Sequence, residues 1–546
     1  MKELNTMKKE SRGRKGSLRR LAAGAMVSLC AFVASVAIAQ HGERATCVVV
    51  SSSQDRVRTP LRVDLERLGT VRPRTAAEIG HSNWTLGCET LDRDFADWDQ
   101  YRDYIAPLGL KAIRLQAGWA KCERERGVYD FAWLDHIVDD AIARGLDPIL
   151  ETGYGNPIYP GGGGWDLGGG FPASDEALAG WDGWVESMAR HFKGRVRDWF
   201  MWNEPDHSPT DGSASKTPEE IAAFNVRTAR TIKRIIPDAR IAGLSLANNT
   251  PAFLETCIRA LGDDVSLFDW FIYHGYAKAP ESSYENVEAQ KEVVARLAPH
   301  ARLRQGENGC PSEMVQRFAL ARLAWSEYSQ AKWDLRRMVG DLGHGVESSV
   351  FTICDFNHRG RGMGRFGLLR ADEDRRVIGI KRAYYAVQNL VSVFGGEDWV
   401  STALAPVDFS ISAYAFASAS GAAPRRVLAF WTHGRDFVEP ELVGKDPCLH
   451  LPKPYNKRIM PYLRPGDSFE TRPVVLEDIG GEPLRDPVWV DLLTGRVYAF
   501  PRDNIVPCGD RVRYLDVPVY DSPCILAERD AFVWDSLAIG NCGVRP

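Results

Sequence analysis

The sequence predicts an α/β fold, in which a (β/α)8 TIM barrel is followed by a C-terminal all-β sandwich domain. From about residue 80 to residue 396, short apolar runs alternate with amphipathic stretches, and Gly or Pro breaks separate them. Eight such units in roughly 320 residues suit a closed barrel. Beyond residue 396 strand-like runs are parted by Pro, Gly and Asp turns, which predicts the sandwich. An open doubly wound sheet is the weaker alternative, because no G-x-G-x-x-G motif follows the first run.

Residues 1–39 are typical of an export signal. Eight basic residues precede the apolar run LAAGAMVSLCAFVASVAIA, which ends in an A-x-A cleavage pattern before Gln40. The alternative is an uncleaved membrane anchor, since the run is near the lower length limit for spanning a bilayer. We therefore expect a protein exported to the periplasm or the extracellular space, which contacts the membrane only if this segment is retained.

The other boundaries follow from the change in pattern. We assign residues 79–396 to the catalytic barrel and residues 397–546 to the β-sandwich domain. Residues 40–78 are an N-terminal extension, and whether they add a strand to the sandwich stays open.

Composition excludes several classes of protein. The chain is 44% hydrophobic and 26% charged, which suits a soluble protein with more than one domain. Loss of the signal removes eight basic and two acidic residues, so the net charge goes from -4 to -10 (-4 - 8 + 2), which argues against a nucleic-acid partner. The cysteines are scattered, without a C-x-x-C pair or an H-E-x-x-H helix, so we predict no metal and no cofactor. Export permits disulfides among Cys508, Cys524 and Cys542, although most cysteines could be buried thiols.

The barrel strands are expected at eight apolar runs. These are WTLGCE near residue 84, KAIRLQAGW at 111, DPILETGY at 147, DWFMWNE at 198, ARIAGLSL at 239, LFDWFIYHGY at 267, ARLRQGEN at 301 and SSVFTICDF at 348. The clearest helix between them opens with TPEE, where Thr217 is the N-cap, Pro218 takes the first position and Glu220 completes a capping box. Gly109 and Gly145 stand where a helix C-cap would precede the next strand.

The stretch DWFMWNEPD, residues 198–206, is the most informative. Its apolar part is short and does not alternate with polar residues, so it predicts a strand buried on both faces. Pro205 disfavours an α conformation at Glu204 and holds the chain extended as this glutamate leaves the sheet. Glu307 ends the seventh run in the same way. Two carboxylates at strand ends of one barrel face suit cleavage of a glycosidic bond, whereas the alternative is that each is a solvated loop residue.

At these residues the sequence resembles the retaining glycoside hydrolases of clan A. WNEP after the fourth run and a Glu after the seventh carry the resemblance, and HGY after the sixth suggests members like family 39, the β-xylosidase and α-iduronidase relatives. The resemblance covers residues 80–396. It implies that Glu204 is the general acid/base, that Glu307 is the nucleophile and that Asn203 hydrogen-bonds the sugar 2-hydroxyl.

The resemblance also implies residues around the nucleophile. Arg114, in IRLQ on the second strand, matches the clan's Arg beside the nucleophile, and Tyr276 matches the hydroxyl that holds it, with His274 nearby. Both groups would favour the ionised form of Glu307. Glu204 should lie in a drier, apolar setting. His274 is equally well explained as a structural histidine.

Further candidates lie on the expected rim. Trp119, Tyr154 and Asn156 follow the second and third runs, and aromatic faces stack on sugars, although aromatic residues are most often core. The Gly-rich segment 159–171 is either a lid that carries Trp165 or a flexible loop, and it lacks the G-K-[ST] ending of a nucleotide site.

The sequence also departs from the family pattern. ENGCPSE follows the seventh run, which makes Glu313 a second candidate carboxylate, although it is expected to begin a helix, where a Glu is routine. The eighth run ends in ICDFN, without the Trp of many clan members. The sequence therefore predicts an exported retaining glycoside hydrolase acting on oligo- or polysaccharides, the alternative being a catalytically silent barrel that binds carbohydrate.

Overall fold

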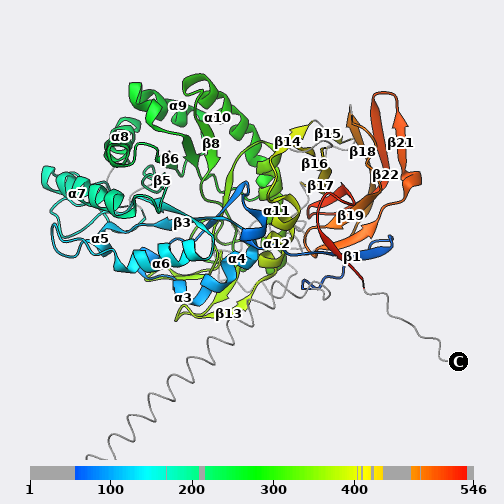
Figure 1. The fold of residues 1–546 in the computed structure, drawn as a ribbon, viewed down its shortest axis with the longest axis horizontal. Coiled ribbons are helices and arrows are strands. Elements are labelled where there is room, and N and C mark those ends of the chain that lie inside the picture. Colours follow the sequence, from blue (N-terminus) through cyan, green and yellow to red (C-terminus); the bar gives the residue numbers. More distant parts are fainter. Residues whose placement is uncertain are drawn as a thin grey trace, which may run out of the picture. The chain divides into compact units, whose positions relative to one another are not determined.

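The computed structural model describes residues 56–167, 169–207, 215–402, 404–406, 410–419, 424–433, 469–479 and 481–537. The predicted export signal of residues 1–39 lies outside the described residues, as do residues 40–55 and Cys542. The described chain forms a parallel barrel followed by antiparallel sheets, which confirms the predicted fold class (Figure 1).

The barrel has eight parallel strands, one at each predicted run. They are β2 (Trp84–Gly87), β3 (Ala112–Gln116), β4 (Asp147–Glu151), β5 (Asp198–Phe200), β6 (Arg240–Leu246), β7 (Trp270–Tyr273), β8 (Arg302–Gln305) and β9 (Ser348–Val350). The sheet order is β8-β7-β6-β5-β4-β3-β2-β9. Isolated parallel bridges, Arg304 with Glu347 and Asn308 with Val350, join the two end strands and close the barrel.

Helices follow every strand, as the alternating pattern predicts. They are α3 (Trp98–Tyr101), α4 (Ile105–Leu108), α5 (Trp119–Cys122), α6 (Ala132–Ala143), α7 (Asp175–Phe192), α8 (Pro218–Ile235), α9 (Pro251–Ala260), α10 (Tyr284–Leu297), α11 (Glu327–Gly343) and α12 (Arg382–Phe394), with the short α2 (Ala76–Ile79) before the barrel. Helix α8 begins with the predicted capping box between Thr217 and Glu220. Gly109 ends α4 with a φ of 96°, a conformation that glycine adopts without strain.

Two small hairpins lie between β9 and α12. They are β10 (Phe356–His358) with β11 (Gly362–Gly364), and β12 (Leu369–Ala371) with β13 (Val377–Ile380). The first hairpin matters below because it contacts the Gly-rich segment after β4.

The C-terminal region consists of two antiparallel sheets that share one hydrophobic core. One sheet has the order β14 (Trp399–Thr402), β16 (Ile411–Ser418), β17 (Arg426–Thr432), β23 (Cys524–Glu528), β19 (Pro487–Asp491), β20 (Arg496–Ala499), β1 (Arg67–Val71) and β24 (Trp534–Ser536). The other has β15 (Leu404–Pro406), β18 (Arg472–Ile479), β22 (Arg511–Val519) and β21 (Ile505–Cys508). Strand β1, blue in Figure 1, comes from the N-terminal extension and pairs with β20 and β24.

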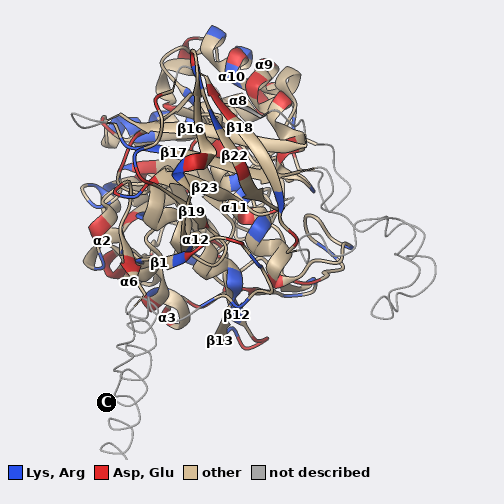
Figure 2. Cartoon of the chain, turned by 90° about the vertical axis from the view of Figure 1, so that its right-hand side faces the viewer, with Lys and Arg blue, Asp and Glu red and all other residues tan. Residues whose placement is uncertain are grey.

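Cysteine and charge distributions add three facts. The seven described cysteines are free thiols, including Cys508 and Cys524. Acidic and basic side chains are intermixed along the described helices and strands (Figure 2). Within the described part of the chain, no helix combines the length and the apolar character that crossing a bilayer requires.

Candidate active site

The two predicted carboxylates meet at the C-terminal ends of the barrel strands. Glu204 follows β5, Glu307 follows β8, and His274 comes directly after β7. One ligand-type atom from each of these three residues lies within 4.8 Å of the others. All three side chains are buried or nearly so, with 9% of Glu204 and 9% of Glu307 exposed. The structure therefore brings together residues that are up to 103 positions apart (307 - 204) in the sequence.

Glu204 leaves the sheet in a different conformation from the predicted one. Its φ is 47°, so the chain turns left-handed at this residue, and the expectation of extended backbone is wrong. A non-glycine residue in this region is strained unless its surroundings hold it. Here its N–H donates to the Ser245 carbonyl at 2.9 Å, and its Oε1 lies 2.7 Å from Nδ1 of His274. These contacts outweigh the preference that Pro205 imposes and direct the carboxyl toward the barrel mouth.

Glu307 is held by two donors from different strands. Arg114 Nη1 donates to its Oε2 at 2.8 Å, and the Tyr276 hydroxyl donates to its Oε1 at 2.9 Å. Burial opposes ionisation of this carboxyl, but the charges of His274 and Arg114 outweigh it and hold the pKa of Glu307 below its ordinary value. Burial and the charge of Glu307 also raise the pKa of the Tyr276 hydroxyl, so that it remains a donor. The arrangement keeps an ionised carboxylate at the end of β8.

His274 lies between the two carboxylates and is 1% exposed. Burial disfavours its charged form, yet the negative charges of Glu307 and Glu204 outweigh burial and raise the pKa of the imidazole. Its Nε2 is buried and has no hydrogen-bond partner among the described residues. His274 thus contacts Glu204 directly and interacts with both carboxylates, rather than being the purely structural histidine that the sequence left open.

Arg114 is the buried centre of the site. Besides Glu307, it donates from Nε to Glu151 at 2.9 Å and from Nη2 to the Asn203 amide oxygen at 2.5 Å, and its Nη1 lies 3.2 Å from Glu89. Sequence reasoning missed Glu89 and Glu151. Glu89 is the last residue of the predicted run WTLGCE, and Glu151 lies inside the run DPILETGY and is the last residue of β4. A search for carboxylates at strand ends, which selected Glu204, would also have found these two.

The predicted rim residues divide into two groups. Asn203 belongs to the site, and its amide nitrogen donates to the Tyr154 hydroxyl at 2.8 Å. Tyr154 is therefore linked to the site through Asn203, and it is 3% exposed. Trp119 is fully buried between the rings of Tyr159 and Trp184, so neither of its faces is free for a sugar, and that expectation is wrong.

Asn156 is also a structural residue. Its amide nitrogen donates to the Glu123 carbonyl at 2.7 Å, its amide oxygen accepts from the N–H of Ile158, and it is 1% exposed. The expectation that it contacts substrate is therefore wrong as well. Asn156 and Trp119 both hold the loop after β4 through Glu123. Asn156 contacts its carbonyl, while Trp119 Nε1 and the Tyr159 hydroxyl donate to its two carboxylate oxygens.

The Gly-rich segment 159–171 is tied to the barrel on both sides. Asp166 pairs with Arg93 at 2.5 Å and with His358 of the β10–β11 hairpin at 2.9 Å. The Arg93 guanidinium in turn lies over the Tyr154 ring, 4.8 Å from its centroid. These contacts argue against a free surface loop, and Trp165 beside them is 49% exposed.

Two residues after β8 and β9 differ from the sequence expectations. Glu313 does not begin a helix, since the next helix starts at Glu327. Its side chain is 45% exposed and pairs with Arg365 and Arg370. Strand β9, the eighth strand of the barrel, ends at Val350. The aromatic residue at its end is therefore Phe351, which precedes the segment ICDFN where the sequence placed the end of this run. Its ring packs against Phe366, which also contacts Tyr276.

The C-terminal sheets brace the loop that carries Tyr276. Trp431 of β17 donates from Nε1 to Glu281, 2.5 Å away, and Arg336 of α11 forms a bidentate pair with the same carboxylate. Trp333 donates to the carbonyls of Ala277 and Lys278. The loop between β7 and α10 is therefore held from both α11 and β17.

The three-residue cluster also raises the question of a metal. Glu204, His274 and Glu307 offer three ligand-type atoms in a small volume. However, Nδ1 of His274 already contacts Glu204, and Arg114 places a permanent positive charge 2.8 Å from Glu307. A further cation would be repelled by that charge, so the donor set fits proton transfer better than metal binding.

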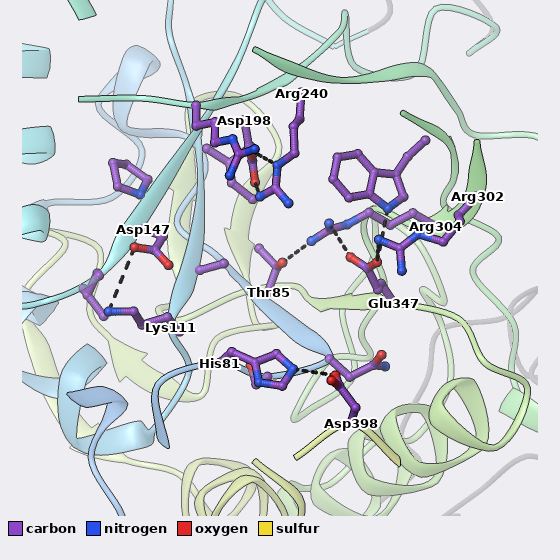
Figure 3. Close-up of a pocket in the computed structure, with 18 of the residues that line it drawn as sticks. His81, Thr85, Lys111, Asp147, Asp198, Arg240, Arg302, Arg304, Glu347 and Asp398 are labelled. Carbon is purple, nitrogen blue, oxygen red and sulfur yellow. Dashed lines mark hydrogen bonds and ion pairs between the residues drawn. The ribbon is translucent and has the colours of Figure 1, made fainter. Parts of the chain in front are cut away.

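A cavity of about 1010 Å³ lies at the opposite end of the barrel (Figure 3). It is lined by residues at the starts of the strands, among them Thr85, Asp147, Asp198, Arg240, Arg302 and Arg304. Figure 3 shows Asp198 paired with Arg240, and Glu347 paired with Arg304. In barrels of this kind the catalytic groups lie at the strand C-termini, so we assign this charged end to stability.

Replacing Glu347 by alanine should test that role. Glu347 lies 2.8 Å from Arg304 and 2.7 Å from Arg302, and Arg304 is 5% exposed. Loss of this carboxylate leaves a buried guanidinium unpaired, so we expect the free energy of unfolding in chemical denaturation to fall by about 3 kcal/mol. The exposed pair of Asp374 with Arg376 is the control, and Asp374→Ala should cost less than about 0.5 kcal/mol. Equal losses in both variants would contradict the assignment.

Solved structures share the architecture of this chain. The chain is similar to a family 39 glycoside hydrolase from the gut symbiont Bacteroides cellulosilyticus WH2, with 16% sequence identity, a TM-score of 0.56, and coverage of 82% of this chain and 81% of that chain. A monomeric β-xylosidase from Caulobacter crescentus CB15 gives 16% identity, a TM-score of 0.52, and coverage of 85% and 97%. A GH39 enzyme from Xanthomonas axonopodis pv. citri gives 16% identity, a TM-score of 0.50, and coverage of 84% of this chain and 95% of that chain. These likenesses show a shared fold.

The family match is more specific than the fold. Residues 72–306 match the model of glycosyl hydrolases family 39. This match confirms the resemblance to clan A, and within it to family 39, and the resemblance indicates a glycosidase. A curated relative, beta-galactosidase BgaA of Clostridium cellulovorans, is 31% identical over 61 residues, a segment that spans 11% of this chain and 9% of that enzyme.

Proposed function

We propose that the protein is an exported, retaining glycoside hydrolase with Glu204 as general acid/base and Glu307 as nucleophile. One observation carries the proposal: carboxylate oxygens of Glu204 and Glu307 lie within 4.8 Å of each other. Retaining enzymes hold their two carboxyl groups about 5–5.5 Å apart, whereas inverting enzymes leave roughly 6.5–9.5 Å for a water molecule. This short separation favours double displacement.

In the first step the Glu307 carboxylate attacks the anomeric carbon. The glycosidic C–O bond breaks, and Glu204 donates its proton to the leaving oxygen. In the second step Glu204 accepts a proton from water, and the water oxygen attacks the anomeric carbon and releases Glu307. Two inversions give net retention.

The surrounding residues support this division of roles. Arg114 and Tyr276 hold Glu307 ionised, as a nucleophile must be, by charge and by hydrogen bonding. Asn203, fixed between Arg114 and Tyr154, keeps one amide hydrogen free for a sugar hydroxyl. Oε1 of Glu204 lies 2.7 Å from Nδ1 of His274, which orients the carboxyl that exchanges the proton.

The substrate class is an oligo- or polysaccharide. The similar protein from Caulobacter crescentus is a β-xylosidase, so β-xylosides are the first substrates to test. Export rests on the signal-like residues 1–39, and mature protein recovered outside the cytoplasm should begin at or near Gln40. If the recovered protein keeps these residues and pellets with membranes, the anchor alternative holds instead.

The test of the proposed function is turnover with retention. We expect the mature protein to hydrolyse at least one member of a panel of aryl β-glycosides and plant glycans, and proton NMR should show the first product with the anomeric configuration of the substrate. A chelator should leave the rate unchanged if no metal takes part. An inverted first product would reject the retaining mechanism. Binding without hydrolysis across the panel would favour the silent carbohydrate-binding barrel.

A further inference from the structure

Three carboxyl groups compete for one guanidinium in the site. Arg114 contacts Glu151, Glu307 and Glu89, and the exposed fractions of these side chains are 1%, 11% and 2%. Arg114 is the permanent positive charge beside these three buried carboxyls, and a protonated His274 would add only one more. Two positive charges do not compensate three negative ones, so one carboxyl is expected to keep its proton. The hydrogen bonds around the three groups indicate which one.

Both Glu151 and Glu307 accept hydrogen bonds from charged or amide and hydroxyl side chains, whereas Oε1 of Glu89 accepts none from the described residues. Glu151 accepts from Nε of Arg114 at 2.9 Å and from Gln116 at 3.1 Å, and Glu307 accepts from Arg114 and Tyr276. Oε1 of Glu89 lies 3.2 Å from Arg114 but accepts no hydrogen bond from any described residue. An ionised carboxylate would not be left with a buried, unsatisfied oxygen.

The second oxygen of Glu89 faces a group that needs a donor. Oγ1 of Thr352 lies 2.6 Å from the Gly87 carbonyl and 3.2 Å from Oε2 of Glu89. A hydroxyl has one proton, which the shorter contact to the carbonyl takes. The contact to Glu89 is then a hydrogen bond only if the carboxyl donates it. The proton of Glu89 therefore belongs on Oε2, directed toward Thr352.

The position of this carboxyl is built into the barrel. A Cβ atom at Gly87 would lie 2.4 Å from Oε2 of Glu89, so only glycine at this position of β2 leaves room for the folded-back carboxyl. Glu89 itself is two residues beyond β2, on the same end of the barrel as Glu204 and Glu307.

We propose that Glu89 is a positioning residue that is held as a neutral carboxylic acid, and that its proton leaves Nη1 of Arg114 free to orient Glu307. Nη1 is the shared atom, since it lies 2.8 Å from Glu307 and 3.2 Å from Glu89. Ionised Glu89 would compete with Glu307 for this donor and add a negative charge beside it. The inference rests on the proposed function, because it assigns Glu307 the role of nucleophile.

The electrostatics of the neighbourhood support the proposal. Burial and the charge of Glu307 raise the pKa of Glu89 from 4.5 to about 8, against the opposing effects of Arg114 and of a backbone hydrogen bond at Glu89. Burial also raises the pKa of Glu151, but that carboxylate has donors to stabilise its charge. The titratable groups that interact with Glu89 are Arg114, Glu151, Glu307, Tyr276, Tyr101 and Cys88.

The catalytic test compares the parent protein with Glu89→Gln. Glutamine keeps the shape of the neutral acid and has no ionisation to lose. Above about pH 8, ionisation of Glu89 should lower kcat/KM of the parent, whereas the variant has no such ionisation. The ratio of the variant's kcat/KM to the parent's should therefore rise by up to about tenfold per pH unit. A ratio that stays constant from pH 6 to pH 10 would overturn the positioning role.

A second pair of variants covers the case in which Glu89→Gln does not fold. Thr352→Val removes the acceptor for the Glu89 proton, so the loss of kcat/KM at high pH should begin at lower pH than in the parent. Thr352→Ser restores a hydroxyl and should restore the parental profile. Identical profiles for the valine and serine variants would contradict the proposed hydrogen bond.

A stability measurement tests the protonation of Glu89 without any substrate. The folded state keeps a proton that the unfolded state releases above pH 4.5, so the parent should lose stability from about pH 5 to about pH 8 and no further above it. Glu89→Gln lacks this loss, and the difference in Tm between variant and parent should grow over that range. Glu292→Gln, an exposed position on α10, is the matched control and should run parallel to the parent. Parallel curves for Glu89→Gln would overturn the inference even if the enzyme proves active, whereas inactivity across the glycoside panel would count against the proposed function alone.

Discussion

Replacing Glu307 by glycine is expected to abolish turnover, with a fall in kcat of roughly 10⁴-fold or more, equivalent to about 5.4 kcal/mol of activation free energy. The variant has no group that can form the glycosyl-enzyme bond. The neighbouring carboxyls Glu89 and Glu151 cannot take its place, because their side chains are 2% and 1% exposed behind Arg114. Rates on an aryl glycoside, measured under single-turnover conditions, test the expectation.

Azide separates the loss of the nucleophile from a loss of folding. The cavity left by the Glu307 side chain should admit this small anion, which then attacks the anomeric carbon directly and gives a glycosyl azide of inverted configuration. Glu313→Ala is the control, since Glu313 pairs with Arg365 on the surface and should be dispensable. Loss of activity in the control alone, or a parental rate in Glu307→Gly, would contradict the assignment of the nucleophile.

The fold was predictable because the barrel repeats one simple pattern. Each of the eight predicted runs contains a strand, since buried parallel strands are continuous apolar runs that are short and bounded by Gly or Pro. The closure of the barrel was not visible in the pattern. It depends on isolated bridges between Arg304 and Glu347 and between Asn308 and Val350, which join residues far apart in the sequence.

The site was predictable only where it coincides with a strand end. Glu204, Glu307, Arg114 and Tyr276 were found in this way, and the structure brings them together. Trp119 shows the limit of the approach, because its residue type suits both a sugar platform and a core. Its burial depends on Trp184 of a later helix.

The conformation of individual residues was the least predictable feature. The left-handed φ of Glu204 results from contacts with Ser245 and His274, which outweigh a local preference set by Pro205. The support of the Tyr276 loop by Trp431 likewise joins two regions that the sequence pattern treats as separate domains. Such long-range contacts leave no periodic signal in either segment.

Replacing Glu204 by alanine should produce a different kind of loss, which depends on the leaving group. Substrates with good leaving groups, such as dinitrophenyl glycosides, need little protonation, so their first step should survive, whereas poor leaving groups should be cleaved roughly 10²–10⁴-fold more slowly. The second step lacks its base for every substrate. The glycosyl-enzyme should therefore accumulate, and a burst of phenol equal to the enzyme concentration should precede slow turnover.

Azide distinguishes this variant from the nucleophile variant by stereochemistry. Azide needs no general base, so it should attack the accumulated glycosyl-enzyme, accelerate its breakdown and give a glycosyl azide of retained configuration. His274 should not replace the missing base, because the charge of Glu307 favours its protonated form. Glu204→Gln, which keeps the side-chain volume, should show the same dependence on the leaving group. An inverted azide product, or equal losses on good and poor leaving groups, would show that Glu204 is not the acid/base.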